Sequence, residues 1–341
     1  MFRRSTPRFL DRGGRPIEGS VASLTFRQVG GVAQAVLIRG IDRNEPVLLY
    51  LHGGPGDAEI LNARRHQAEL ERAFVVANWD QRGAGLSYSA AVPRSSMTLG
   101  QLVEDTIELS RWLAETFGRE RIVLAAHSFG TIIGLLAAQR APELFTAYVG
   151  IGQVVEPAES ERRMYDWALA EAGRRRDART RRALEGIGPL PHTTRTAHRT
   201  LRGAVARFGG RYRTVSDRAI ARDTLLHLRE YTLLDLGRWR RGERFSVETL
   251  LSEAATIDMA RRVTRLLIPT YFVAGRYDRI CDPDLAREYL RVLDAPRKGW
   301  AWIEDAAHLA PFEEPDAVAA ALAHFSREAE SAGAPAWTVA G

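Results

Sequence analysis

Short apolar runs recur along the chain and alternate with amphipathic stretches. Runs rich in valine, leucine and isoleucine have the length and composition of strands buried on both faces of a parallel sheet. They cover residues 46–52, 73–80, 121–127, 145–155, 266–275 and 299–303. Upstream, residues 21–29 and 32–40 are extended runs separated by Gly30-Gly31, a dipeptide that tolerates positive φ angles. The pattern predicts a hairpin that leads into a mostly parallel sheet.

Amphipathic stretches predict helices between these strands. The clearest covers residues 98–118, where aliphatic residues recur on one side, Thr98 and Gln101 have capping-box spacing, and Gly118 stands where a helix would end. An apolar helix is also predicted directly after Ser128. Strands and helices in alternation indicate an α/β fold with a doubly wound, mostly parallel sheet.

The stretch from residue 156 to residue 262 breaks this alternation. Long charged helical segments replace the apolar runs there, and the strand pattern returns only afterwards. We therefore predict a core formed by residues 20–155 and 263–330, interrupted by a helical insert over residues 156–262. Residues 1–19 are polar and contain glycine, so they are predicted to form a flexible arm, and residues 331–341 a flexible tail.

The charge of the chain does not indicate a nucleic-acid partner. The formal net charge is +6, and Lys298 is the only lysine, so the basic side chains are almost all arginine. Arginine clusters at residues 174–176 and 181–182 alternate with acidic residues. That arrangement is typical of a solvated helix face, and we expect no stripe that binds phosphates.

Composition also excludes several kinds of site. Cys281 is the only cysteine, and the eight histidines lack ligand spacing, so neither a disulfide within the chain nor a metal site is expected. Nothing in the sequence calls for a cofactor. No run of about 18 apolar residues occurs, and the N-terminal residues lack the apolar core of a secretion signal. We expect a soluble cytoplasmic protein without a membrane partner.

Ser128 lies where a predicted strand meets a predicted helix, in the segment AHSFG over residues 126–130. Such a sharp turn needs small residues two positions before and after the serine, and Ala126 and Gly130 meet that need. The common form of this turn has glycine at the first place, so Ala126 adds one methyl group. Taken alone, the segment fits an ordinary turn with an incidental serine as well as it fits a nucleophile exposed at a helix N-terminus.

A nucleophilic serine needs a base and an acid that orients the base. Both residue types follow downstream, in the order serine, acid, histidine that accompanies this turn. Asp278 comes just after the strand-like run over residues 266–275, and His308 follows the run over residues 299–303. The three residues are predicted to meet at the carboxyl ends of the strands.

Other residues of the same types fit these roles less well. Asp282 is the alternative acid, although it lies farther into a turn before Pro283. His52 belongs to a different loop, His324 falls within the last predicted helix, and His127 is expected to pack beneath the serine.

The segment HGGPG over residues 52–56 follows the first buried strand. Only glycine lets a loop press its backbone against a reacting atom, and hydrolysis through an acyl-enzyme needs backbone N–H donors for the oxyanion. We assign one donor to Gly54 and the other to Phe129. A plain glycine-proline turn is the alternative.

Together these segments resemble the proline iminopeptidases of the α/β-hydrolase superfamily. The likeness rests on LHGGPG, DQRGAGLS over residues 80–87, AHSFG, GRYD, and AAH followed by EEP, and it extends over about residues 20–328. It implies an α/β-hydrolase fold with a triad of Ser128, Asp278 and His308. The DQRGAGLS loop would be architectural, with Asp80 and Arg82 tying loops together near the pocket.

The resemblance also implies a cap and a site for the substrate amine. The helical insert would cover the active site and supply carboxylates that hold the free α-amine of a peptide. Among the acids of the insert we select Glu161 and Glu230, with Gly53 as a further substrate contact. The elbow departs from the Gly-Gly-Ser-Trp form usual in these peptidases, so serine chemistry is better supported than the peptidase activity.

The leading hypothesis is a serine hydrolase of proline-iminopeptidase type. It would release an N-terminal residue, often proline, from a small peptide or amide. An esterase, thioesterase or acyl-amide hydrolase of specialised metabolism with the same triad is the alternative. A non-catalytic receptor on the same fold is a third possibility. The partner is in each case a small molecule or short peptide, and the sequence does not indicate an oligomeric state.

Overall fold

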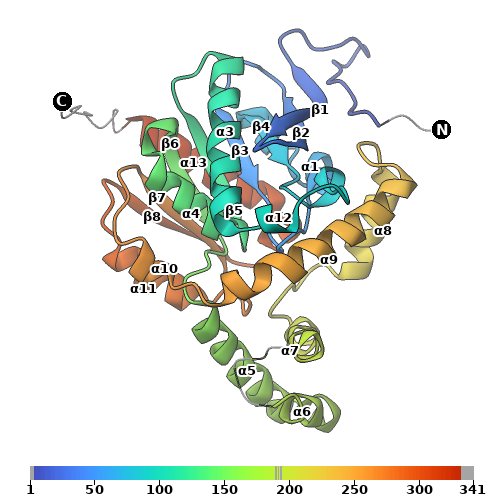
Figure 1. Cartoon of the computed structure of the whole chain (residues 1–341), viewed down its shortest axis with the longest axis vertical. Coiled ribbons are helices and arrows are strands. Elements are labelled where there is room, and N and C mark those ends of the chain that lie inside the picture. Colours follow the sequence, from blue (N-terminus) through green and yellow to red (C-terminus); the bar gives the residue numbers. More distant parts are fainter. Residues whose placement is uncertain (1–3, 189, 191, 193, 332–341) are drawn as a thin grey trace.

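An eight-stranded sheet lies at the centre of the computed structural model, which describes residues 4–188, 190, 192 and 194–331 (Figure 1). The strand order is β1-β2-β4-β3-β5-β6-β7-β8. β1 and β2 form the predicted hairpin, β2 also runs antiparallel to β4, and all other neighbours are parallel. The strands are β1 Val21–Val29, β2 Val32–Gly40, β3 Val47–Leu51, β4 Val75–Trp79, β5 Ile122–His127, β6 Phe145–Ile151, β7 Thr270–Gly275 and β8 Lys298–Ile303.

Helices cover both faces of the sheet. α3 (Leu99–Phe117), α4 (Gly130–Arg140) and α11 (Pro283–Val292) contribute to one apolar cluster. α2 (Leu70–Ala73) and α13 (Pro315–Ser331) contribute to the cluster on the opposite face. Strands β3 to β7 are buried almost throughout, as their unbroken apolar runs predict. The prediction of an α/β fold with a mostly parallel, doubly wound sheet is confirmed. Two short helices, α1 (Ile60–His66) and α12 (Ala310–Glu313), lie in the loops after β3 and β8.

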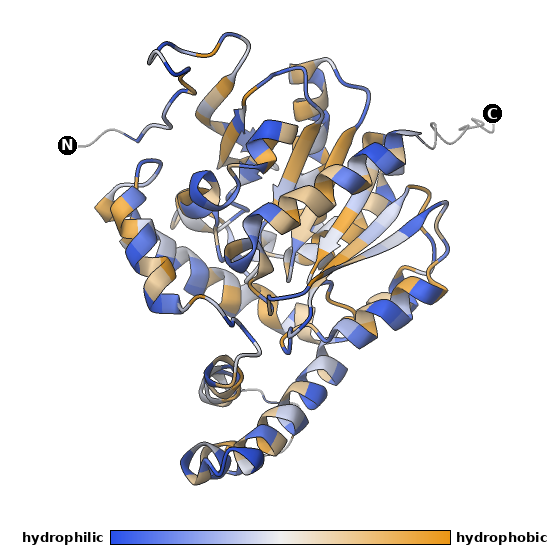
Figure 2. Ribbon diagram, turned by 180° about the vertical axis from the view of Figure 1, so that it is seen from behind, coloured by the Kyte–Doolittle hydropathy of each residue, from blue (hydrophilic) through white to orange (hydrophobic). Residues whose placement is uncertain are grey.

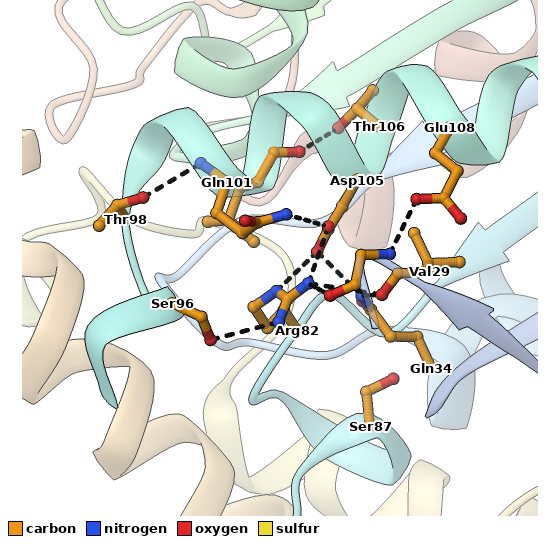
Figure 3. Close-up of polar contacts among 12 residues, drawn as sticks. Val29, Gln34, Arg82, Ser87, Ser96, Thr98, Gln101, Asp105, Thr106 and Glu108 are labelled. Carbon is orange, nitrogen blue, oxygen red and sulfur yellow. Dashed lines mark hydrogen bonds and ion pairs between the residues drawn. The ribbon is translucent and has the colours of Figure 1, made fainter. Parts of the chain in front are cut away.

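The start of α3 differs in one detail from the sequence prediction. Thr98 Oγ1 accepts a hydrogen bond from the Gln101 backbone N–H at 3.1 Å, which is half of a capping box. The Gln101 side chain does not return to Thr98. It donates instead to Asp105 Oδ1 at 2.8 Å, because that buried carboxylate needs donors (Figure 3).

Arg82 and Asp105 form a buried ion pair that joins three segments of the core (Figure 3). Arg82 Nε and Nη2 donate to the two carboxylate oxygens at 2.8 and 2.9 Å, and Nη2 also reaches the Gly30 carbonyl at 2.8 Å. The loop after β4, helix α3 and the β1–β2 turn therefore meet at one guanidinium. A Cβ atom on Gly30 would lie 2.1 Å from Asp105 Oδ1, so no larger residue fits this turn. The sequence prediction that Arg82 ties loops together agrees with this arrangement.

Asp80 ties a core loop to the insert. Its carboxylate accepts hydrogen bonds from the Leu86 N–H at 2.8 Å and from the hydroxyl of Tyr231, which precedes α9 (Leu233–Ala255). Burial raises the pKa of Asp80 to about 7, against the opposing effect of these donors.

Helices α5 to α10 occupy the chain between β6 and β7. α5, α6 and α7 stand away from one end of the sheet, whereas α9 runs back along the core (Figure 1). Their bounds are α5 Pro157–Arg174, α6 Ala178–Glu185, α7 Arg195–Arg207, α8 Asp217–His227, α9 Leu233–Ala255 and α10 Met259–Arg262. No helix in the described part of the chain has both the length and the apolar composition needed to cross a membrane.

The N-terminal segment contacts distant parts of the protein through residues 4–7. We expected a flexible arm over residues 1–19, but Arg4 pairs with Asp235 at 2.5 Å, and Arg39 donates to Thr6 Oγ1 and the Pro7 carbonyl at 2.6 and 2.7 Å. These contacts join residues far apart in sequence, so local composition could not predict them. Apart from Ser331, the last residue of α13, the predicted tail lies outside the described residues.

Candidate active site

Ser128 occupies a strained turn between β5 and α4. Its φ angle is +52°, a left-handed conformation that is uncommon for a residue with a side chain. A Cβ atom on Gly130 would lie 2.6 Å from the carbonyl oxygens of Leu51 and His52, so glycine is required after the serine. The methyl group of Ala126 fits because α4 presents Gly134 to it: a Cβ at position 134 would be 3.1 Å from the Ala126 Cβ.

The structure brings Ser128, His308 and Asp278 together at the carboxyl ends of three strands. Ser128 Oγ lies 2.9 Å from His308 Nε2, and His308 Nδ1 lies 2.8 Å from Asp278 Oδ2. The tautomer that satisfies both contacts carries the proton on Nδ1, which donates to the carboxylate, and leaves Nε2 to accept the hydroxyl proton. This is the geometry of an activated serine nucleophile.

Asp278, and not Asp282, faces the histidine. The second oxygen of Asp278 accepts hydrogen bonds from the backbone N–H groups of Ile280 and Cys281 at 2.8 and 3.0 Å, which fix the carboxylate. Asp282 caps α11 by accepting from the Asp284 and Leu285 N–H groups, and its carboxylate also pairs with Arg163.

The remaining histidines near the site hold loops in place. His127 is buried beneath the serine, and its Nε2 lies 3.0 Å from the backbone carbonyl of His308. His52 Nε2 accepts from the Gln81 N–H at 3.1 Å, which joins the HGGPG loop to the loop after β4. His324 lies on α13 with Glu328, away from these contacts.

The electrostatics of the site favour a neutral base. Burial lowers the pKa of His308 from its ordinary value of 6.5; the Asp278 carboxylate opposes this shift, and the charges of His127 and Arg202 add to it. The imidazole is therefore uncharged at neutral pH and able to accept a proton. Burial raises the pKa of the Cys281 thiol, so this thiol remains protonated and does not compete as a nucleophile.

This shift predicts the pH dependence of turnover. We expect kcat/KM to rise as His308 loses its proton, with the midpoint of the acid limb below 6.5 and a plateau at neutral pH. The measurement is kcat/KM for one neutral substrate across the acid range at constant ionic strength. An acid limb centred above 6.5 would contradict the prediction, since a base charged at neutral pH cannot accept the serine proton.

Glu313 links the loop that carries His308 to the insert. One carboxylate oxygen accepts hydrogen bonds from the backbone N–H groups of Arg213 and Thr214, the latter at 2.7 Å, and the other accepts from the Ala307 N–H at 2.8 Å.

Two backbone hydrogen bonds also join the insert to the loops of the triad. The Leu309 N–H donates to the Arg211 carbonyl at 3.0 Å, and the Arg279 N–H donates to the Gly210 carbonyl at 2.9 Å. The segment 210–214 is therefore attached to both the acid loop and the base loop.

Replacing Glu313 with glutamine is expected to lower kcat/KM by roughly 10- to 100-fold. An amide has one oxygen that accepts hydrogen bonds, so it cannot bind the insert and the Ala307 N–H together, and the loop that carries His308 loses its position. The variant should stay folded, and the loss should fall mainly on kcat. Steady-state kinetics and thermal unfolding, each compared with the neighbouring Glu314→Gln, provide the measurement. Equal kinetics in the two variants would show that Glu313 has no positioning role.

The HGGPG loop lies directly against the serine. A Cβ atom on Gly53 would be 3.1 Å from Ser128 Cβ, so any side chain here would crowd the serine, and Gly54 has a φ of +120°. Phe129 is the N-cap of α4, where backbone N–H groups lack helical partners. Neither the Gly54 nor the Phe129 N–H donates a hydrogen bond to a described residue. Both predicted donors are thus unpaired within the described residues, and they directly follow Gly53 and Ser128 in the chain.

The two carboxylates selected as amine ligands have other partners. Glu161 on α5 lies 3.1 Å from His192 Nδ1 and 3.6 Å from His198 Nδ1. Glu230 is buried and pairs with Arg64 at 3.1 Å, and its described hydrogen bond and ion pair do not reach the serine, the histidine or Asp278. The structure therefore does not bring Glu230 to the candidate site.

Two residues at the site were missed from the sequence. Asp57 follows HGGPG in the same turn, where its N–H donates to the Gly53 carbonyl at 3.2 Å. Burial raises the pKa of Asp57 to about 6, and the negative charge of the nearby Glu59 is the second cause of this shift. Asp57 is therefore mostly ionised at neutral pH. Its place directly after a glycine motif was an available signal. Glu313 lay within the quoted EEP segment, but its partners come from the insert and could not be read from spacing.

The described residues contain no cluster of three or more histidine, cysteine or acidic side chains arranged to hold a metal ion. The contacts above need no such ion to connect the serine, the imidazole and the carboxylate.

The chain matches known proteins over most of its length. Residues 46–315 match the family model described as alpha/beta hydrolase fold. The chain is 33% identical over 314 residues to a Bacillus subtilis (strain 168) protein named "Probable aminopeptidase YbaC". That match covers 92% of this chain and 98% of the relative.

Solved structures show the same likeness at lower identity. The proline iminopeptidase of Mycobacterium smegmatis superposes with a TM-score of 0.67 at 19% identity, over 92% of this chain and 100% of that chain. A proline iminopeptidase-related protein from Thermus thermophilus gives a TM-score of 0.62 at 23% identity, over 91% of this chain and 98% of that chain. At these identities the likeness concerns the fold.

Proposed function

Because the chain belongs to the α/β-hydrolase fold family, we propose that it is a serine hydrolase that releases an N-terminal residue from small peptides or amides. The observation that carries the proposal is the continuous contact from Ser128 Oγ through His308 to Asp278, at 2.9 and 2.8 Å. An ordinary turn serine has no reason to face a buried imidazole that is itself fixed by a carboxylate.

In the proposed reaction, Ser128 Oγ attacks the substrate carbonyl carbon while His308 Nε2 takes the hydroxyl proton. Asp278 stabilises the imidazolium that forms. The N–H groups of Phe129 and Gly54 would receive the carbonyl oxygen as it becomes negative, and one such donor contributes about 3–4 kcal/mol to the barrier reduction. His308 then gives the proton to the leaving amine. Water, activated by the same imidazole, hydrolyses the acyl-enzyme and restores Ser128.

Specificity for a free amine is supported by acids beside the HGGPG loop. Asp57 is surrounded by enough protein to raise its pKa, yet part of its surface is still open to solvent in this turn. A Cβ atom on Gly56 would lie 3.0 Å from the Glu243 Cα, so α9 brings a second acid against the same loop. Glu161 and Gly53 remain further candidates. The aminopeptidase name of the Bacillus relative and the iminopeptidase titles of the structural neighbours point the same way. We propose that the insert acts as a cap over this site.

The engagement of Glu161 and Glu230 by other side chains favours a second candidate, because it leaves fewer carboxylates for an amine. This candidate is an esterase, thioesterase or acyl-amide hydrolase with the same Ser128–His308–Asp278 chemistry.

The deciding experiment compares aminoacyl β-naphthylamides with their N-acetylated forms and with short p-nitrophenyl esters. An aminopeptidase should hydrolyse the free-amine substrates about 10- to 100-fold faster than the acetylated ones, because one charge-assisted contact is lost. Asp57→Asn should raise KM for the free-amine substrates only. Activity confined to esters, or indifference to acetylation, would favour the second candidate.

A further inference from the structure

Four leucines at the junction of α8 and α9 are exposed to solvent. Leu225 and Leu226 lie at the end of α8 with exposed fractions of 54% and 73%, and Leu233 and Leu234 begin α9 with 73% and 79%. Figure 2 shows apolar colour at this end of the two helices. Single exposed leucines are common, but these four stand on the two sides of one short connection, and we call them the leucine corner.

The leucine corner is held in place by the residues beneath it. Arg64 donates to the His227 carbonyl at 2.5 Å and pairs with Glu230, and the Tyr231 hydroxyl bonds to Asp80. Thr224 Oγ1 bonds to Asn62 Oδ1 at 2.5 Å. These polar side chains therefore face inward and have partners, while the leucines face outward.

Exposed arginines lie on the same helix faces as the leucines. On α8, Arg218 and Arg222 precede Leu225 and Leu226 at spacings of four and of three to four residues, which places them along one side. On α9, Arg240 and Arg241 follow the leucine pair two turns later, beyond the exposed Gly237. Arg229 is exposed in the connection itself. The apolar tip thus has a basic border.

This border has a net positive charge because the local acids are already paired. Each carboxylate between residues 217 and 241 forms an ion pair with an arginine from outside that segment: Asp217 with Arg211, Asp223 with Arg65, Glu230 with Arg64 and Asp235 with Arg4. Within the described part of the chain, the five border arginines 218, 222, 229, 240 and 241 have no carboxylate partner. Their counter-charge must come from another molecule or from solvent.

We propose that the leucine corner docks on an anionic lipid surface, with the leucines in the interfacial apolar layer and the arginines at the phosphate groups. Apolar side chains bordered by arginine are the physical requirements for such binding. A second copy of this chain fits less well, because a twofold contact places the patch against itself and sets the arginines opposite one another. No membrane partner was expected from the sequence, since no apolar run is long enough to span a bilayer, but surface docking needs no such run.

The test is cosedimentation of the full chain with phosphatidylcholine vesicles that do or do not contain phosphatidylglycerol, at low and high salt. We expect binding to the phosphatidylglycerol vesicles that high salt weakens. The double variant Leu226→Ser with Leu234→Ser should bind at least about 10-fold more weakly, since two apolar anchors are lost. Arg222→Gln with Arg240→Gln should weaken binding and reduce its dependence on salt.

Val292→Ser on α11 is the matched control, because this valine is 63% exposed and lies on another helix; it should bind like the wild type. Thermal unfolding of every variant should be unchanged, because the replaced side chains are exposed. Absence of binding to phosphatidylglycerol vesicles overturns the proposal. So does a wild-type dimer, measured by light scattering, that the leucine variant converts to monomer without any vesicle binding. The outcome is independent of whether Ser128 is a nucleophile.

Discussion

Replacement of Ser128 with alanine is expected to lower kcat by about four to six orders of magnitude on any substrate that the protein hydrolyses. The methyl group cannot attack a carbonyl, and the backbone donors that remain stabilise only attack by water. KM should change little, because Ser128 contributes little to substrate binding before the chemical step. The structure should be retained, since alanine is smaller than serine and the turn at position 128 already has its φ of +52°.

The measurement pairs single-turnover kinetics with labelling by a fluorophosphonate probe. The wild type should be labelled at Ser128 and the variant should not. Ser252→Ala, on an exposed position of α9, serves as the matched control and should keep both labelling and activity. If Ser128→Ala retained a substantial rate, a nucleophile other than Ser128 would be required, and the proposed mechanism would be wrong.

Replacement of Arg82 with alanine is expected to destabilise the fold by about 3–5 kcal/mol, because it leaves the Asp105 carboxylate buried without its cation. The two side chains are 1% and 0% exposed, so water cannot replace the guanidinium without a change in the structure. The amide groups of Gln34 and Gln101, each at 2.8 Å, would remain as donors but carry no charge. The loss should also loosen the β1–β2 turn, which Arg82 holds through Gly30.

Urea unfolding provides the measurement, read as a lower midpoint at an unchanged slope. Arg181→Ala is the control: Arg181 pairs with Glu185 at 2.8 Å, but the side chains are 57% and 47% exposed, so the expected loss is below about 1 kcal/mol. Similar losses in the two variants would mean that the buried pair contributes no more than a surface pair does.

The sequence predicted those parts of the molecule that depend on local pattern. Unbroken apolar runs indicated the strands. The predicted membership of the α/β-hydrolase superfamily is confirmed by the family model that matches residues 46–315. Ser128, Asp278 and His308 could be selected because each follows a strand and parallel strands end at one edge. The structure places them in contact, and their chemical roles stay a prediction until the kinetics are measured.

What the sequence did not predict depends on contacts between distant segments. Arg4 and Asp235 are 231 residues apart, so the docking of the N-terminal segment has no local signal. Glu230 was selected for its residue type alone. In the structure it forms an ion pair with Arg64 on α1, a contact between distant segments that the sequence does not show. The Gln101 side chain had two possible partners, the Thr98 backbone N–H as a donor and the Asp105 carboxylate as an acceptor. The carboxylate prevailed because an unsatisfied buried charge costs more than an incomplete helix cap.

The segment from Gly210 to Thr214 cannot serve as the hinge of a lid. Its backbone is hydrogen-bonded to Arg279, Leu309 and Glu313, so any swing of this segment would pull the general base away from the serine. A hinge of the proposed cap must therefore lie elsewhere in the insert. It must also leave α5 and α7 in place, because both helices pack in one apolar cluster with Ile280 and Cys281 of the acid loop. Substrate could then enter and product leave while the reacting groups stay aligned between successive cycles.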